Sequence, residues 1–105
     1  MTTSISNLVE QVKTATNYQK NKHLLREKIL TDLHVPYNGG LFLVNQQLLA
    51  FLATWSTDSL FLEDVYNNPI QITRTELLTL AQQHYQTVMN EWHIQHNELK
   101  RIRKI

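Results

Sequence analysis

The chain of 105 residues contains no cysteine and very few residues that break helices. Without cysteine, disulfides and all thiol-based metal sites or nucleophiles are excluded. The two glycines are adjacent, Gly39-Gly40, and the prolines are Pro36 and Pro69, so the turn signals gather in the middle of the chain. No apolar run approaches the roughly 20 residues that a membrane span needs. We therefore expect a soluble protein of one domain, residues 1–105, that does not enter a membrane.

Charged residues make up 18% of the chain, which is ordinary for a globular protein, but net charge of one sign is nearly absent and the distribution of charge is uneven. The formal net charge is +1, which is weaker than the positive charge typical of dedicated DNA-binding domains. Residues 1–35 and 73–105 each contain five Lys or Arg and three Asp or Glu, whereas residues 36–72 contain three acids and no base. We expect the basic ends to neutralise the acidic middle, within one fold or between copies.

Residues 73–105 show the longest helical pattern. Thr73 and Glu76 have the spacing of a capping box, in which each side chain accepts from the other residue's backbone N–H. An apolar stripe follows at spacings of three and four, which only Gln95 interrupts: Leu78, Ala81, Tyr85, Val88, Trp92, Leu99 and Ile102. A helix of this length would extend about 50 Å at 1.5 Å per residue, so it needs a partner along its length.

Residues 1–35 are also predicted to be helical, ending before Pro36. Two apolar stripes flank the polar stretch 16–22, one over Ile5–Ala15 and one over Leu24–Leu33. Residues 36–72 predict a turn, a short helix and a hairpin. Asn38-Gly39-Gly40 forms the turn, Asn45 caps a helix over Gln46–Thr54, and strands 60–66 and 70–72 flank the turn at 67–69. The fold class is therefore α+β, predominantly helical.

Two explanations of the long apolar stripe stay open. It could pack against residues 1–35 of the same chain, or it could form a seam with a second copy or another protein. Large aromatic side chains dominate protein interfaces. The predicted protein-binding residues are therefore Tyr85, Trp92, Leu99 and Ile102.

The end of this helix is basic. Lys100, Arg101, Arg103 and Lys104 could complement the helix dipole, or bind an anionic partner, either nucleic acid or an acidic protein surface. Four bases alone would bind DNA weakly. Lys20, Lys22, Arg26 and Lys28 would join them only if the first helix runs alongside.

We find no pattern that predicts catalysis. His93 and His96 could chelate a metal ion, but no carboxylate at a suitable spacing completes a site. Glu63 and Asp64 would point to opposite faces of a strand, which suits edge protection or a salt bridge better than acid–base work. Gly39-Gly40 lacks the lysine of a phosphate-binding loop. We therefore expect no catalytic residue, no metal, no cofactor and no enzyme activity.

Two segments, residues 32–42 and 62–70, resemble parts of small uncharacterised proteins of large tailed bacteriophages. The resemblance implies a phage protein located in the host cytoplasm or in the virion. On this basis we expect a non-enzymatic, virion-structural or assembly-related protein that docks on itself, on another phage protein or on a host protein. The alternative is a small regulator that binds DNA, or a host transcription or replication protein, through the basic tip.

Overall fold

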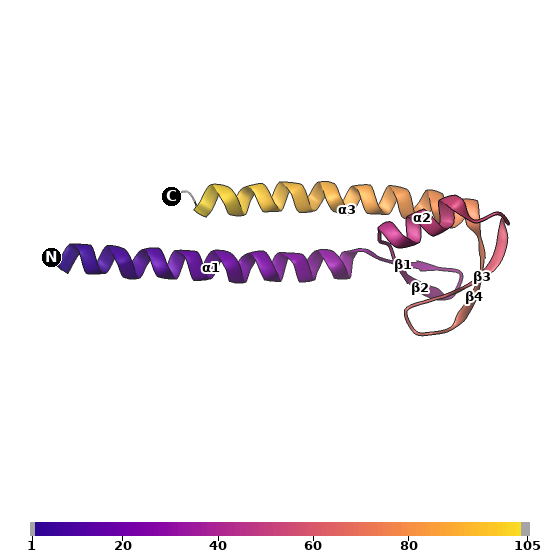
Figure 1. Cartoon of the computed structure of the whole chain (residues 1–105), viewed down its shortest axis with the longest axis horizontal. Helices are drawn as coiled ribbons and strands as arrows, with labels where there is room; N and C mark the ends of the chain where they lie inside the picture. Colours follow the sequence, from indigo (N-terminus) through magenta and orange to yellow (C-terminus); the bar gives the residue numbers. More distant parts are fainter. Residues whose placement is uncertain (1, 104–105) are drawn as a thin grey trace.

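The computed structural model describes the backbone of residues 2–103 and the side chains of residues 17–102. Two long helices, α1 (Thr2–Asp32) and α3 (Arg74–Arg103), lie side by side and form what we call the arm (Figure 1). The head, residues 34–73, lies at one end of the arm. It contains β1 (His34–Tyr37), β2 (Gly40–Leu43), α2 (Gln46–Thr54), β3 (Ser59–Glu63) and β4 (Pro69–Thr73). The predicted α+β class, dominated by helix, is confirmed.

The arm is held together by an apolar seam between α1 and α3. Leu25 and Ile29 of α1, and Leu33 just after it, form one buried cluster with Val88 of α3, and Ile29 is only 1% exposed. Four half-buried side chains of α3 pack around this cluster: Tyr85, Met89, Trp92 and Leu99. The apolar stripe predicted over Ile5–Ala15 lies outside the described side chains.

The head contains two hairpins, whereas the sequence predicted one. β1 pairs with β2 in antiparallel register, with Val35 opposite Phe42. Asn38 and Gly39 connect the strands with φ values of 49° and 85°, as a type I′ turn requires. Pro36 is tolerated because a two-stranded sheet consists only of edge strands. The apolar run 41–44 had suggested a short strand, which β2 matches, but its partner β1 was predicted to be helix or turn because it is only four residues long and contains Pro36.

The second hairpin was predicted, but its first strand ends three residues early. β3 stops at Glu63, because Asp64 organises the following turn. Its carboxylate accepts from the backbone N–H groups of Tyr66 and Asn68 at 3.0 and 2.9 Å. It also accepts from the N–H of Leu41 in the first hairpin, at 3.1 Å. Asp64 therefore joins the two hairpins, and its predicted role in edge protection is wrong.

The hairpins approach each other closely at Gly40. A Cβ atom at this position would lie 2.6 Å from Cγ1 of Ile70 and 3.3 Å from the Asp64 carboxylate. Any larger residue would force the Ile70 side chain to shift, because real Cβ contacts are not this short. Gly40 is therefore required for packing, whereas Gly39 is required for its positive φ.

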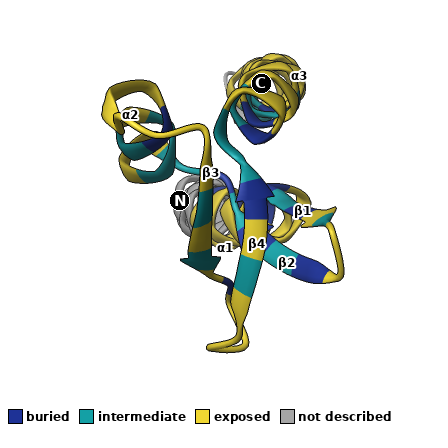
Figure 2. Ribbon diagram, turned by 90° about the vertical axis from the view of Figure 1, so that its right-hand side faces the viewer, coloured by how far each residue is buried: buried dark blue, intermediate teal, exposed yellow. Residues whose placement is uncertain are grey.

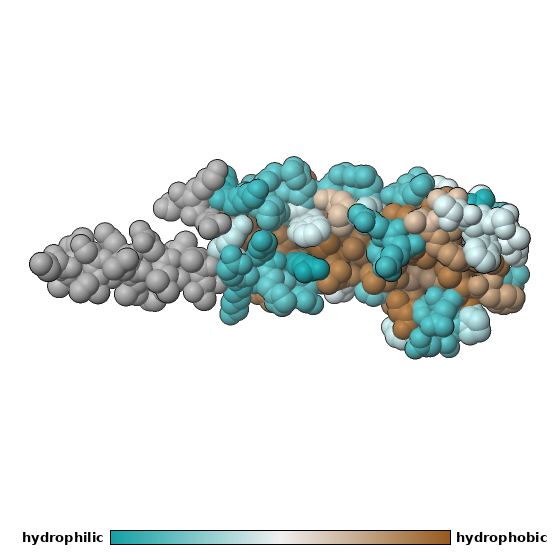
Figure 3. Space-filling view, in the orientation of Figure 1, coloured by the Kyte–Doolittle hydropathy of each residue, from teal (hydrophilic) through white to brown (hydrophobic). Residues whose placement is uncertain are grey.

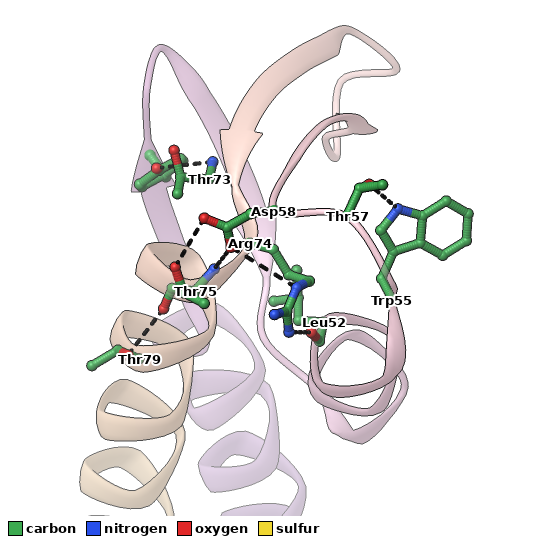
Figure 4. A network of polar contacts seen from close by, with 9 residues as sticks. Leu52, Trp55, Thr57, Asp58, Thr73, Arg74, Thr75 and Thr79 are labelled. Atoms are coloured by element: carbon green, nitrogen blue, oxygen red, sulfur yellow. Dashed lines mark hydrogen bonds and ion pairs between the residues drawn. The ribbon is translucent and has the colours of Figure 1, made fainter.

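The predicted capping box of the long helix does not form. Thr73 is the last residue of β4, and Glu76 accepts a hydrogen bond from the Tyr37 hydroxyl at 2.8 Å. Asp58, in the loop between α2 and β3, caps α3 instead (Figure 4). Its backbone carbonyl accepts from the N–H of Arg74 at 2.6 Å, and its carboxylate accepts from the N–H of Thr75 at 3.2 Å.

Arg74 also connects α3 to α2. Its guanidinium donates to the backbone carbonyl of Leu52 at 2.8 Å, and its Nε lies 4.0 Å from the Asp58 carboxylate. The predicted start of α2 is confirmed, since the side chain of Asn45 accepts from the N–H of Leu48 at 2.8 Å. Polar groups thus fix α2 and both hairpins to the start of α3.

We predict that Asp64→Asn destabilises the protein at neutral pH and reduces its sensitivity to acid. Backbone hydrogen bonds, first that of Asn68, lower the pKa of the Asp64 carboxyl below its ordinary value, against the opposing effect of burial. Because the folded pKa lies below the unfolded one, the carboxylate stabilises the fold above the unfolded value of about 3.8. This stabilisation is lost as the pH falls through the folded pKa.

Thermal unfolding measured between about pH 2 and pH 7 checks this prediction. The difference in melting temperature between the wild type and Asp64→Asn should shrink toward acid pH. The neighbouring exposed acid provides the control, because Glu63→Gln should leave the acid dependence close to that of the wild type. A constant difference across the range would contradict the role given to the carboxylate.

Candidate protein-binding groove

A groove runs along the face of the arm on which α2 lies. Its first hollow, of about 330 Å³, is bounded by α1, α3 and the start of α2. Figure 3 shows apolar surface exposed between the two arm helices next to the head. The residues that line this hollow are Arg26, Ile29, Leu30, Leu33, Asn45, Gln46, Gln47, Tyr85, Met89 and Trp92.

The helices position these side chains by their periodicity. Tyr85, Met89 and Trp92 are spaced i, i+4, i+7 and therefore share one face of α3. Arg26 and Leu30 are spaced i, i+4 on α1, on the side that borders the buried seam. Leu30 is 39% exposed, although it follows the fully buried Ile29. The groove wall is thus the outer edge of the stripe that forms the core of the arm.

A second hollow, of about 240 Å³, continues the groove away from the head. It shares Arg26 and Trp92 with the first hollow, so the two form one continuous surface, which we call the arm groove. Its other lining residues are Gln19, Lys22, His23 and His96. From Tyr85 to His96 the arm groove extends about 16 Å at 1.5 Å per residue, or three turns of helix.

The charge of the arm groove has one sign. Lys22 and Arg26 line it together with His23 and His96, and no Asp or Glu is among the described residues that line either hollow. Glu27 lies 3.7 Å from the His23 ring, but not in the lining. The hollow next to the head therefore contains most of the apolar lining residues together with Arg26, whereas the far hollow is lined mainly by polar and basic residues around Trp92.

The four predicted protein-binding residues lie in different environments in the structure. Tyr85 and Trp92 line the arm groove and are half-buried against α1. Leu99 packs on the same cluster. Ile102 is 58% exposed. The intramolecular explanation therefore accounts for the inner edge of the stripe, while its outer edge stays open to a partner.

The basic tip is only partly described. Lys100 and Arg101 are exposed, and Arg101 donates to the Glu98 carboxylate at 2.7 Å within the same helix. The side chains of Arg103 and Lys104 lie outside the described residues. The first helix does run alongside the last one, since α1 and α3 lie side by side (Figure 1), and Figure 2 shows both helices end-on from the side of the head. Sequence reasoning had not placed Lys22 and Arg26 in a groove, since helical spacing alone does not show which helix lies opposite.

His93 and His96 do not share one environment. His93 is exposed and its Nε2 lies 3.2 Å from the amide nitrogen of Asn97, while His96 is half-buried in the arm groove. Among the residues that the structure describes, no three His, Cys, Asp or Glu side chains are close enough to hold a metal ion. In the same part of the chain no helix has an apolar stretch long enough to cross a membrane.

We predict that alanine substitutions at two adjacent positions of α1 have different effects on stability, because one side chain lies in the core and the other lines the arm groove. Ile29→Ala should cost about 2–5 kcal/mol of unfolding free energy, because it leaves a cavity in the buried seam. Leu30→Ala should cost less than about 1 kcal/mol, since the side chain is already partly in water. Urea unfolding of both variants measures the difference. Equal losses would show that Leu30 belongs to the core and that the apolar hollow is not a free surface.

Comparison with known proteins gave no match. No protein-family model matches the chain, and no curated protein and no solved structure is significantly similar to it. The functional conclusions below therefore follow from the geometry of the arm groove and from the phage resemblance of the two segments.

Proposed function

We propose that this chain is a non-enzymatic phage interaction protein, virion-structural or assembly-related, that docks through the long helix α3. Its place of action would be the host cytoplasm or the virion. The observation that carries the proposal is the arm groove, where Tyr85 and Trp92 present aromatic surface beside the exposed Leu30. Buried aromatic anchors of this kind supply much of the energy of protein interfaces.

The shape of the molecule supports a docking role. Its radius of gyration is 20.1 Å, against about 13 Å for a compact domain of 100 residues. An extended arm exposes more side-chain surface per residue than a compact domain, and this surface contains exposed apolar residues at Leu24, Ile94 and Ile102. Such a geometry favours contact along a line over binding of a small molecule in a closed pocket.

Site-directed crosslinking during infection tests the proposal. A photoreactive amino acid at Leu30 faces the arm groove, whereas one at the adjacent exposed Thr31 points away from it. We expect Leu30 to crosslink to one virion or assembly protein, and Thr31 to give no such product. Trp92→Ala should remove the product while the circular dichroism of the purified variant stays helical. Equal crosslinking from both positions, or none from Leu30, would contradict the proposal.

A second candidate function is the regulator that binds DNA, or a host transcription or replication protein. The observation that favours it is the alignment of α1 with α3, because both helices of the arm then contribute basic residues, Lys22 and Arg26 on α1 and Lys100 and Arg101 on α3. Phosphate contacts from both helices could then follow one nucleic-acid strand.

Salt dependence distinguishes this candidate. Four phosphate contacts predict that affinity for duplex DNA falls about 100-fold between about 50 and 200 mM salt. Neutralising Lys22, Arg26, Lys100 and Arg101 to Gln should remove that dependence and most of the binding. Fluorescence anisotropy of a labelled duplex measures both effects. Binding that ignores salt, or that survives the four substitutions, would exclude the nucleic-acid version.

A further inference from the structure

We infer that the arm groove accepts an acidic amphipathic helix of a different protein, which becomes a third helix of the arm. This inference rests on the proposed docking function and specifies the class of partner. It follows from two properties of the groove, its length and its division into an apolar and a basic part. It also follows from the charge of the chain's own helices, which decides whether a second copy could be the partner.

The apolar part has the dimensions of a helix-binding site. Two antiparallel helices already form its walls, and a third helix can pack its side chains between their ridges. The lining extends over about three turns of α3. A partner helix of similar length would place apolar residues at i, i+3 or i+4, and i+7 against Leu30, Met89 and Trp92.

The basic part determines the charge of the partner. Lys22 and Arg26 flank the groove beyond Trp92, and no described acidic residue in the lining neutralises them. Because Arg26 lines both hollows, an acidic residue of the partner would meet it directly after the apolar contacts end. A helix that combines apolar residues with Asp or Glu at one end therefore complements the whole groove.

A second copy of this chain does not supply such a helix. By sequence, α1 contains more Lys and Arg than Asp and Glu, and α2 contains neither. Residues 75–99 of α3 contain three Glu and no base, but their apolar face already packs against α1. The acidic residues of the head lie outside helices. Asp58 caps α3 and Asp64 is buried in a turn, while the Glu63 side chain accepts from Asn67 at 2.7 Å. Charge complementarity thus favours a foreign partner.

Nucleic acid fits the arm groove less well than an acidic helix. A phosphate backbone would engage Lys22 and Arg26, but it would leave the apolar hollow beside Leu30 and Met89 unfilled. Burial of that apolar surface is favourable, and a nucleic acid would leave it in water. Only a ligand with an apolar face uses both parts of the groove.

Model peptides test the inference on the full-length protein. The probe is a fluorescein-labelled helix of about 14 residues, or four turns, with leucine at every third or fourth position and glutamate elsewhere. One comparison peptide replaces each glutamate with lysine, and another scrambles the acidic peptide so that it has no apolar face. We expect the acidic amphipathic peptide to bind at least tenfold more tightly than either.

Charge reversal then locates the site. Arg26→Glu should weaken the acidic peptide at least tenfold, whereas Lys28→Glu makes the same charge change on α1 outside the groove lining and should have little effect. The double variant Lys22→Glu/Arg26→Glu should prefer the lysine peptide. Circular dichroism confirms that the variants are folded.

Four results would overturn the inference. The first is equal binding of the acidic and lysine peptides. The second is equal loss for Arg26→Glu and Lys28→Glu. The third is self-association, measured by light scattering, that blocks the peptide, because it would make a second copy the occupant. Tighter binding of a labelled DNA duplex that competes with the peptide would also overturn it in favour of nucleic acid.

The crosslinking experiment distinguishes this inference from the broader proposal. If Leu30 crosslinks to a virion or assembly protein through a segment that is not an acidic helix, the inference fails and the docking function stands. If Leu30 captures no protein, the docking function itself fails, whatever the peptides do.

Discussion

The seam between α1 and α3 is the contact on which the rest of the structure depends. Burial of Ile29 and Val88 holds the two helices side by side, although their ends are separated by the whole head. Without this seam there is no arm groove, because its walls come from segments more than fifty residues apart in the sequence. The same residues that stabilise the fold therefore define the width and direction of the candidate site.

In the head, two carboxylates hold together segments that are distant in the sequence, as the seam does in the arm. Asp58 and Asp64 accept backbone N–H groups from segments distant in the sequence, and so replace local caps with long-range ones. This explains which predictions failed. The short helix at Asn45 was predicted correctly because its cap lies three residues away, whereas the capping box at Thr73 lost to Asp58 from another loop. Local patterns predict local partners, and the head uses few of them.

The sequence predicted the residues of one wall of the arm groove and missed those of the other. Periodicity identified Tyr85 and Trp92 as residues of one helical face, and that face does line the groove. It could not show that Lys22 and Arg26 form the opposite wall, because the register between two helices depends on the seam and not on either sequence alone. It also could not divide the stripe into a buried inner edge and an open outer edge. That division follows from the distance between the helices.

The junction between β4 and α3 has a mechanical consequence. Thr73 ends the strand and Arg74 begins the helix, so no loop residue separates them. Hinges need a few residues that can absorb changes in φ and ψ, and this junction has none to spare. The first turn of α3 therefore sets the direction in which the second hairpin leaves the arm, and Asp58 holds the same turn from the other end of that hairpin.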